Sequence, residues 1–316
     1  MLTKGGHTRM SFLEELASES TRPVVVAALL HNGTNPDAVF RDLDDIAQAN
    51  ARGRRLVGAV SCCPLAMDFT LRSPYTFEGL ESWQPALALK GAAYEAKLGE
   101  KRFRDGVREE LARPAHFRLF NAQWDKVHVI ESGRRGVEQR PVGELAREAG
   151  ADPLDYMLDL ALEENLRTVF SALLLNSDEE AVGRMLRHPA SLVSLSDAGA
   201  HLTFFNDAGF GLHLLGHWVR ERGALTLADA ARRLTSHPAG VFGIRERGAL
   251  RPGYHADLLL FDPATVNRGP KVRVFDLPGG HPRLSTPAIG VQGVWVNGVR
   301  LDGETRSGHL LREFSA

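Results

Sequence analysis

Cysteine is scarce in this sequence of 316 residues, which contains only Cys62 and Cys63. Neighbouring cysteines rarely bridge each other because the required geometry strains the backbone. We therefore expect two free thiols and a cytoplasmic protein. No apolar run approaches the ~20 residues of a membrane-spanning helix, and the first residues lack the apolar core of a signal peptide. From these absences we expect that the protein is not exported and does not lie in a membrane.

The net charge is also close to zero, because the sequence contains 38 basic and 39 acidic residues. This balance gives no electrostatic basis for binding nucleic acid or an anionic membrane surface. We interpret the short basic cluster Arg52-Gly53-Arg54-Arg55 as a solvated helix end or loop. No Gly-x-Gly-x-x-Gly or phosphate loop occurs. What the sequence does contain is 43% hydrophobic residues, ample for a sizeable core.

Buried strands alternate with helices in the first part of the chain. Residues 24–30 and 56–61 are apolar runs typical of fully buried strands, and residues 35–50 carry the spacing of an amphipathic helix. This β-α-β order predicts a parallel sheet whose strand ends gather at one edge. Residues 126–130 are a third strand candidate, after a long aromatic-bearing loop and helical segments from 83 to 113.

After residue 240 the residue pattern becomes typical of β-strands. Residues 256–262 form one strand candidate, and residues 293–300 read as a hairpin with Asn297-Gly298 at its turn. We therefore predict two parts, residues 1–240 and residues 241–316.

The most informative stretch begins with an apolar run, residues 191–195, and ends in Asp197-Ala198-Gly199-Ala200-His201. An aspartate after a buried strand is well placed for chemistry. The same residue types also favour a turn, in which the aspartate side chain would only hydrogen-bond to the nearby backbone. The residues alone leave both interpretations open.

The sequence resembles the N-acyl-D-amino-acid deacylases of the amidohydrolase superfamily. The resemblance rests on His188-Pro189 running into Ser196-Asp197-Ala198-Gly199-Ala200-His201, on Arg247-Gly248-Ala249-Leu250-Arg251-Pro252-Gly253 with Ala256-Asp257-Leu258, and on Val296-Asn297-Gly298. Asp276-Leu277-Pro278 also looks like this branch. The similarity is most specific from about residue 178 onward.

The resemblance implies an α/β fold, with part of a metal-dependent (β/α)8 barrel in residues 1–240 and a β-rich segment of a composite β-sandwich in residues 241–316. It implies hydrolysis of an amide bond in a small N-acyl amino acid, with Zn²⁺ as cofactor. Asp197 matches the carboxylate that ends the last barrel strand, so the resemblance makes it both metal ligand and catalytic base.

Members of this superfamily carry a His-x-His pair on the first barrel strand, and this chain has none. We therefore expect the chain to correspond to the C-terminal portion of such an enzyme, to bind zinc weakly and to be inactive alone. The alternative is a non-catalytic or split-enzyme subunit that acts by association. Its partner would be a second copy of the chain or a complementary N-terminal half.

Several further residues are candidates for the site. His31 follows the first strand and is the best candidate for another metal ligand, while His201 is a candidate for substrate binding. Cys62 and Cys63 follow a strand but are more simply buried, inert thiols. His128 is interpreted as a core residue. The pair His213 and His217 has helical i, i+4 spacing but lacks the glutamate of the His-Glu-x-x-His pattern.

Overall fold

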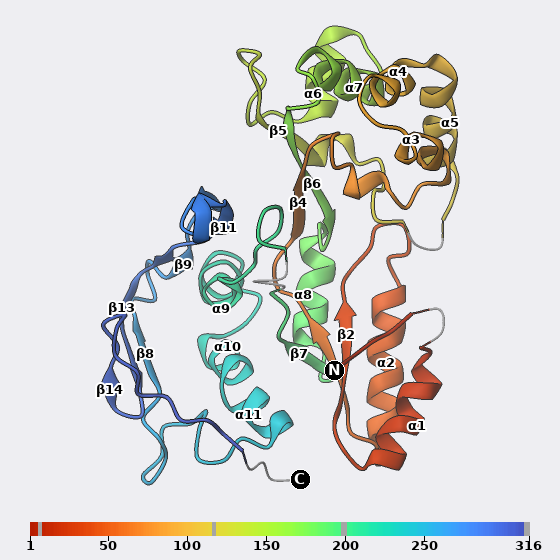
Figure 1. Cartoon of the computed structure of the whole chain (residues 1–316). Coiled ribbons are helices and arrows are strands. Elements are labelled where there is room, and N and C mark those ends of the chain that lie inside the picture. Colours follow the sequence, from red (N-terminus) through yellow and green to blue (C-terminus); the bar gives the residue numbers. More distant parts are fainter. Residues whose placement is uncertain (6–7, 116–117, 197–200, 313–316) are drawn as a thin grey trace.

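The computed structural model describes residues 1–5, 8–115, 118–196 and 201–312. A parallel sheet with its helices lies at the base of the view in Figure 1, a second body lies above it, and a β-rich body lies to one side. We call residues 64–176 the insertion and residues 258–300 the β segment. Among the described residues, no helix has the length and apolar character needed to cross a membrane.

Four parallel strands form the base of the fold, in the order β1-β2-β3-β7. They are β1 (Leu2–Thr3), β2 (Val24–Leu29), β3 (Leu56–Val60) and β7 (Ser191–Val193). Helix α1 (Met10–Ser20) joins β1 to β2, α2 (Ala38–Ala51) joins β2 to β3, and α8 (Glu179–Arg187) precedes β7. The predicted β-α-β order is therefore confirmed for β2, α2 and β3.

The two faces of this sheet pack against different layers. Val24, Val26 and Leu29 of β2 join a core built with α1, α2 and α8. Alternate residues point the other way, as they must in a strand. On that second face, residues of β2, β3 and β7 form a smaller cluster that packs against Val241. Burial on both faces explains why these strands read as continuous apolar runs.

The insertion leaves the sheet after β3 and returns before α8. It holds a three-stranded antiparallel sheet, ordered β4-β6-β5, with β4 (Leu65–Phe69), β5 (Val127–Glu131) and β6 (Val169–Leu175). Its helices are α3 (Gln84–Leu87), α4 (Ala92–Gly99), α5 (Lys101–Ala112), α6 (Val142–Ala149) and α7 (Pro153–Glu163). Short 3-10 turns occur at η1 (Tyr75–Phe77), η2 (Glu81–Trp83) and η3 (Trp124–Lys126).

Aromatic side chains fill the centre of the insertion. Phe77 and Trp83 are fully buried and stack with ring centroids 4.6 Å apart. Phe120 lies 4.7 Å from Phe77, and Phe103 lies 5.2 Å from Trp83 in an edge-on arrangement. Offset and edge-on aromatic contacts are the preferred geometries of such rings. The insertion thus has a hydrophobic core of its own.

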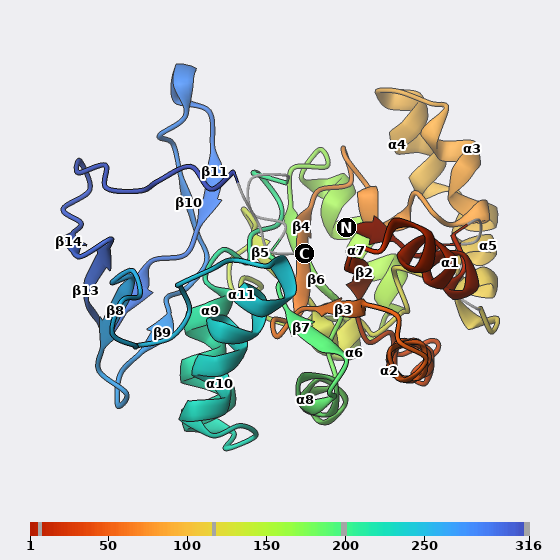
Figure 2. The same cartoon turned by 90° about the horizontal axis from the view of Figure 1, so that it is seen from below.

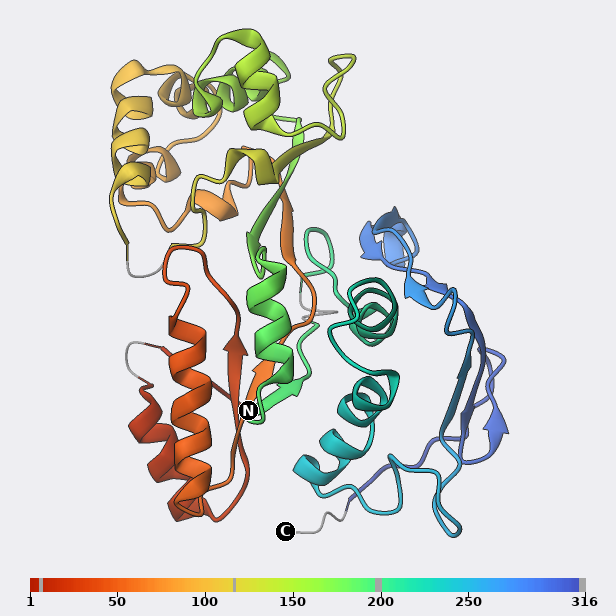
Figure 3. The same cartoon turned by 180° about the vertical axis from the view of Figure 1, so that it is seen from behind.

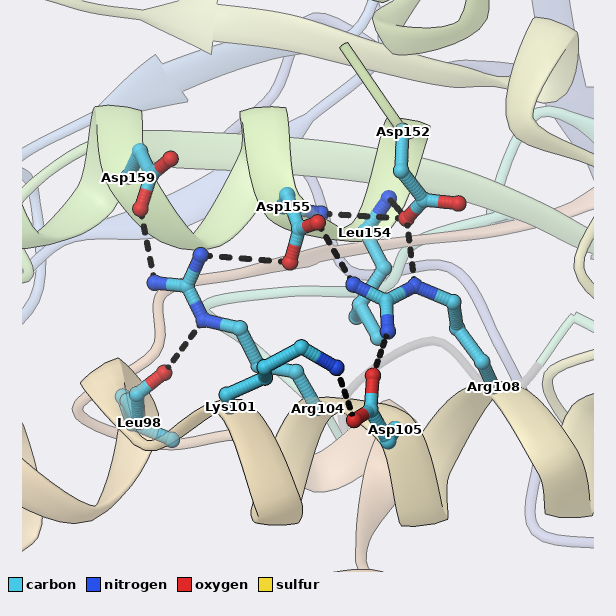
Figure 4. Close-up of polar contacts among 9 residues, drawn as sticks. All are labelled: Leu98, Lys101, Arg104, Asp105, Arg108, Asp152, Leu154, Asp155 and Asp159. Atoms are coloured by element: carbon cyan, nitrogen blue, oxygen red, sulfur yellow. Dashed lines mark hydrogen bonds and ion pairs between the residues drawn. The ribbon is translucent and has the colours of Figure 1, made fainter.

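Ion pairs join α5 to α7 on the outside of this core, as Figure 4 shows. Arg104 contacts Asp155 at 3.2 Å and Asp159 at 2.6 Å, and it donates to the carbonyl of Leu98. Arg108 contacts Asp155 at 2.5 Å. Asp152, which also pairs with Arg108, caps α7 by accepting the N–H groups of Leu154 and Asp155.

The chain continues after β7 through helices that lie between the parallel sheet and the β segment (Figures 1 and 3). These are α9 (Phe210–His213), the π-helix η4 (Leu214–Glu221), α10 (Leu227–Leu234) and α11 (Ser236–Phe242). The β segment holds β8 (Leu258–Phe261), β9 (Asn267–Arg268), β10 (Val272–Val274), β11 (Arg283–Ser285), β12 (Ala288–Ile289), β13 (Val291–Val296) and β14 (Val299–Arg300), with the turn η5 (Pro278–Gly280).

The hairpin prediction is confirmed, because β13 and β14 pair on either side of Asn297-Gly298 and both turn residues have positive φ. The strand predicted at residues 126–130 is confirmed as β5. It pairs with β6 in the antiparallel sheet of the insertion. Residue 240 lies inside α11, and the first strand of the β segment begins at Leu258. The division into residues 1–240 and 241–316 stays a prediction.

Candidate functional site

The candidate site lies at the edge of the parallel sheet where the strands end, because parallel strands bring their carboxyl ends together. His31 follows β2, and Ser61, Cys62 and Cys63 follow β3. The stretch that contains Asp197 follows β7. The insertion lies above this edge in Figure 1.

Asn176, at the exit of the insertion, joins the ends of β2 and β3. Its amide nitrogen donates to the carbonyls of Ser61 and Cys63, each at 3.1 Å, and its amide oxygen accepts the N–H of His31 at 2.8 Å. The Asn176 N–H donates in turn to the carbonyl of His31 at 2.9 Å. Its φ of 53° is a left-handed conformation that asparagine tolerates well. Asn176 therefore fixes the backbone at the start of the site.

His31 is held by this backbone but has an uncommitted ring. The residue is 4% exposed, and its Nδ1 is buried without a hydrogen-bond partner among the described residues. Its ring centroid lies 6.5 Å from that of Phe40 in α2. Burial lowers the pKa of His31, with the nearby Asp178 opposing the shift. The imidazole is thus neutral near pH 7, the form that binds a metal.

Cys62 and Cys63 are free and fully buried, as the sequence predicted. The Cys62 thiol donates to the carbonyl of Phe210 at 3.2 Å. Burial raises the pKa of Cys62 well above its usual range. A thiol that stays protonated is a poor nucleophile and a poor metal ligand, so Cys62 has a packing role.

Asp197, the central residue of the sequence-based hypothesis, lies outside the described residues, as do residues 198–200. The described chain on either side is tied to the site. The N–H of Ser194 donates to the carbonyl of Val60 at 3.1 Å, and the N–H of Asp207 donates to the carbonyl of Ser196 at 3.1 Å. The approach to and return from this stretch are thus held at the ends of β3 and β7.

His201 lies partly exposed where the described chain resumes. Its carbonyl accepts the N–H groups of Phe204 and Phe205, and its ring centroid lies 5.0 Å from that of Phe204. The structure gives no contact between His201 and His31 among the described residues. Its predicted role in substrate binding stays a prediction.

Two carboxylates near this edge were missed by sequence reasoning. Asp207 is buried and pairs with Arg268 of β9 at 2.7 Å. Asp68 of β4 is held by its N–H, which donates to the carbonyl of Phe204. Burial raises the pKa of Asp68, opposed by a hydrogen bond from Ser171. Groups that act as acids or bases in a site often have a raised carboxyl pKa. The sequence gave no sign of this role for Asp68, because its position in a strand of alternating apolar and polar residues is ordinary.

His213 and His217 stack with ring centroids 4.8 Å apart. His217 lies between Glu179 and Glu221, at 2.9 and 3.0 Å, while burial lowers the pKa of His213 to about 3. Within the described ranges, no group of three or more His, Cys, Asp or Glu side chains converges as a metal site. The described residues therefore do not by themselves fit a zinc centre, whose structural and catalytic forms use three or four protein ligands.

Comparison with known proteins gives the site a context. A segment of this chain is 32% identical over 164 residues to the N-acyl-D-aspartate deacylase of Alcaligenes xylosoxydans xylosoxydans, covering 49% of this chain and 30% of that protein. A D-aminoacylase of the same organism is 32% identical over 161 residues, covering 50% of this chain and again 30% of the relative. The matched segment thus spans about a third of these relatives' length.

The fold is shared with a solved enzyme. The N-acyl-D-glutamate deacylase from Bordetella bronchiseptica, crystallised with zinc and a phosphonate inhibitor, superposes with a TM-score of 0.51 and 19% identity. The superposition covers 96% of this chain and 52% of that one. The model of the amidohydrolase family matches residues 90–301, which is more than half of the sequence. The chain belongs to the amidohydrolase family.

Proposed function

We propose that this chain is part of a metal-dependent hydrolase of amide bonds that acts on small N-acyl-D-amino acids. The observation that carries the proposal is the family match over residues 90–301, together with relatives named N-acyl-D-aspartate deacylase and D-aminoacylase. In this proposal the parallel sheet is part of a (β/α)8 barrel and the β segment is part of a β-sandwich. The two free cysteines favour a cytoplasmic location.

The proposed catalytic residue is Asp197. It follows β7 by four residues, and barrel enzymes place catalytic groups at the carboxyl ends of their strands. There its carboxylate takes the proton of the attacking water and returns it to the leaving amine. His201, four residues further on, is proposed to contact the substrate.

Zn²⁺ is the cofactor that the family implies, and it would polarise the scissile carbonyl and activate water. We propose Asp197 and His31 as the ligands that this chain contributes. His31 is supported by its neutral ring and uncommitted Nδ1. Because the sequence given contains no His-x-His pair, we expect weak zinc binding by the chain alone.

The test substitutes Asp197 by asparagine, which keeps the shape and removes the base. In any preparation that hydrolyses N-acetyl-D-aspartate or N-acetyl-D-glutamate, Asp197→Asn should lower kcat at least about 100-fold. Asp45→Asn, on the exposed side of α2, is the matched control and should leave kcat unchanged. Turnover retained by Asp197→Asn would exclude Asp197 as the base.

Elemental analysis tests the metal part separately. We expect less than one zinc per chain after dialysis, together with no deacylase activity in the isolated chain. Stoichiometric zinc and full activity would contradict the incomplete centre.

The second candidate function is association with another chain, either as a split-enzyme subunit or as a non-catalytic module. It is favoured by Leu258, Leu259 and Leu260, three consecutive residues of β8 that are all exposed. Runs of this kind on a sheet mark interaction surfaces. Light scattering decides the matter: a dimer or a complex with a complementary half supports association, whereas a strictly monomeric, active chain excludes it.

A further inference from the structure

A cavity of about 450 Å³ lies at the opposite edge of the parallel sheet, where the strands begin. It separates the starts of β2 and β3 from α11, and Figure 2 views the molecule from this edge. Its apolar wall is formed by Pro23, Leu56, Val57 and Val241. Its polar lining comes from Arg54, Arg55, Asn50, Ser236 and His237. No aspartate or glutamate is among its lining residues.

Arg54 and Arg55 bring positive charge to this cavity without a committed counter-ion. Both residues are exposed, and no ion pair joins either guanidinium to a carboxylate among the described residues. The hydrogen bond from Arg52 and, to a smaller extent, the charge of Arg54 lower the pKa of Glu14. That group is already engaged by Arg52, with contacts of 2.7 and 2.8 Å.

The backbone that carries the two arginines is fixed. The N–H of Arg54 donates to the carbonyl of Ala49, and the carbonyl of Arg55 accepts the N–H of Val24 at 2.8 Å. Gly53, with a φ of 85°, makes the turn from α2 into this short connection. The two guanidinium groups are therefore presented from a rigid base, which lowers the entropic cost of binding.

The opposite wall contributes His237, and the buried Arg233 lies nearby in the sequence, in α10. Nδ1 of His237 and Nε of Arg233 are both buried without a hydrogen-bond partner in the described part of the chain. Arg233 is 6% exposed, and its Nη1 donates to Ser191 at the start of β7 at 3.2 Å. Burial, Arg232 and Arg233 together lower the pKa of His237. Buried polar atoms of this kind normally have partners, so the unpartnered Nδ1 of His237 in the lining is available for a hydrogen bond with a ligand.

We propose that this cavity binds a small organic anion, with an oxyanion head group held by Arg54, Arg55 and His237 and a compact apolar body against Leu56 and Val57. Guanidinium groups bind phosphate and carboxylate oxygens through paired hydrogen bonds. The volume lies within the range of small-molecule sites, which combine apolar walls with a few placed polar groups. The site is at the opposite edge of the sheet from His31 and the end of β7, so the ligand is not the substrate in its proposed catalytic position.

The test is calorimetric titration of the full chain with phenyl phosphate, with inorganic phosphate and with phenol. Phenyl phosphate should bind more tightly than either, because it alone offers both the charge and the apolar body. Benzoate distinguishes a carboxylate from a phosphate head group, and the tighter binder identifies the class. Absence of binding by both anions at millimolar concentration would overturn the proposal, and so would phenol binding as tightly as phenyl phosphate.

Variants assign the binding to this cavity. Arg54→Gln combined with Arg55→Gln should weaken phenyl phosphate at least tenfold. Arg102→Gln combined with Arg113→Gln removes the same charge from exposed positions of the insertion and should change the affinity less than twofold. His237→Gln should weaken binding, whereas His281→Gln, at an exposed position of the β segment, should not. If both double arginine variants lost the same affinity for phenyl phosphate, the attraction would be unspecific and the proposed site would be overturned.

Discussion

The insertion and the β segment are both attached to the parallel sheet, yet they are built in opposite ways. The insertion buries a large cluster of aromatic and aliphatic side chains among its own elements. In the β segment, Val266 and Leu284 are the buried apolar residues among those described, while Leu258, Leu259, Leu260, Ile289, Val294 and Val299 are exposed. Apolar burial is the main stabilising contribution to folding. The insertion can therefore stabilise itself, whereas the β segment depends on its neighbours.

The largest effect should come from the aromatic core of the insertion. Trp83→Ala removes a fully buried indole that stacks on Phe77, and it should lower the free energy of unfolding by about 3–5 kcal/mol. Trp295→Ala, in half-buried β13, is the matched control and should cost about 1 kcal/mol. Urea denaturation followed by far-UV circular dichroism measures both. Equal losses would remove the contrast between the two regions.

An intermediate effect should come from the junction between η4 and β9. A methyl group at Gly216 would lie 2.5 Å from the carbonyl oxygen of Val266, so Gly216→Ala should push the two elements apart at a cost of about 1–3 kcal/mol. Limited proteolysis should then show faster cleavage within the β segment and unchanged cleavage within the insertion. Gly99→Ala meets nothing within 4 Å and is the control. A uniform rise in cleavage would show that the junction is not specific to the β segment.

The smallest effect should come from the ion pairs. Arg104 has an 11% exposed side chain, two carboxylate partners and a carbonyl partner, so Arg104→Met should cost about 1–2 kcal/mol. Arg283→Met breaks an exposed, solvent-screened pair with Asp276 in the β segment and should lower the free energy of unfolding less than Arg104→Met does. Repeating the denaturation at about 1 M salt should reduce the effect of Arg283→Met more than the effect of Arg104→Met, because salt screens exposed pairs most strongly. A larger loss for Arg283→Met would reverse the comparison.

Sequence reasoning identified the elements that carry strong local signals. The apolar runs of β2 and β3, the amphipathic face of α2 and the Asn297-Gly298 turn all appear as predicted. The Asp152 cap of α7 is a signal of the same local kind, because a cap requires only neighbouring residues. Each of these signals is contained within about fifteen residues.

The failures share a dependence on distant partners. The strand β4 was not predicted, because Leu65, Met67 and Phe69 alternate with residues whose role is set by pairing with β6. The helix α11 (Ser236–Phe242) was not predicted from the sequence either. The site residues Asn176 and Asp207 were missed for the same reason. Their partners lie far away in the sequence, at His31, Ser61 and Arg268.

The bridge made by Asn176 also bears on how the chain folds. β3 ends at Val60 and its neighbour β7 begins at Ser191, so the two strands must meet across a long stretch of chain. Closing a loop costs an entropy that grows with its length, and distant contacts slow folding. Once the insertion has folded, the hydrogen bonds of Asn176 hold the end of the insertion beside its start. Little more than α8 then separates β3 from β7 along the chain. We expect the insertion to form early and to shorten the search by which β7 finds β3.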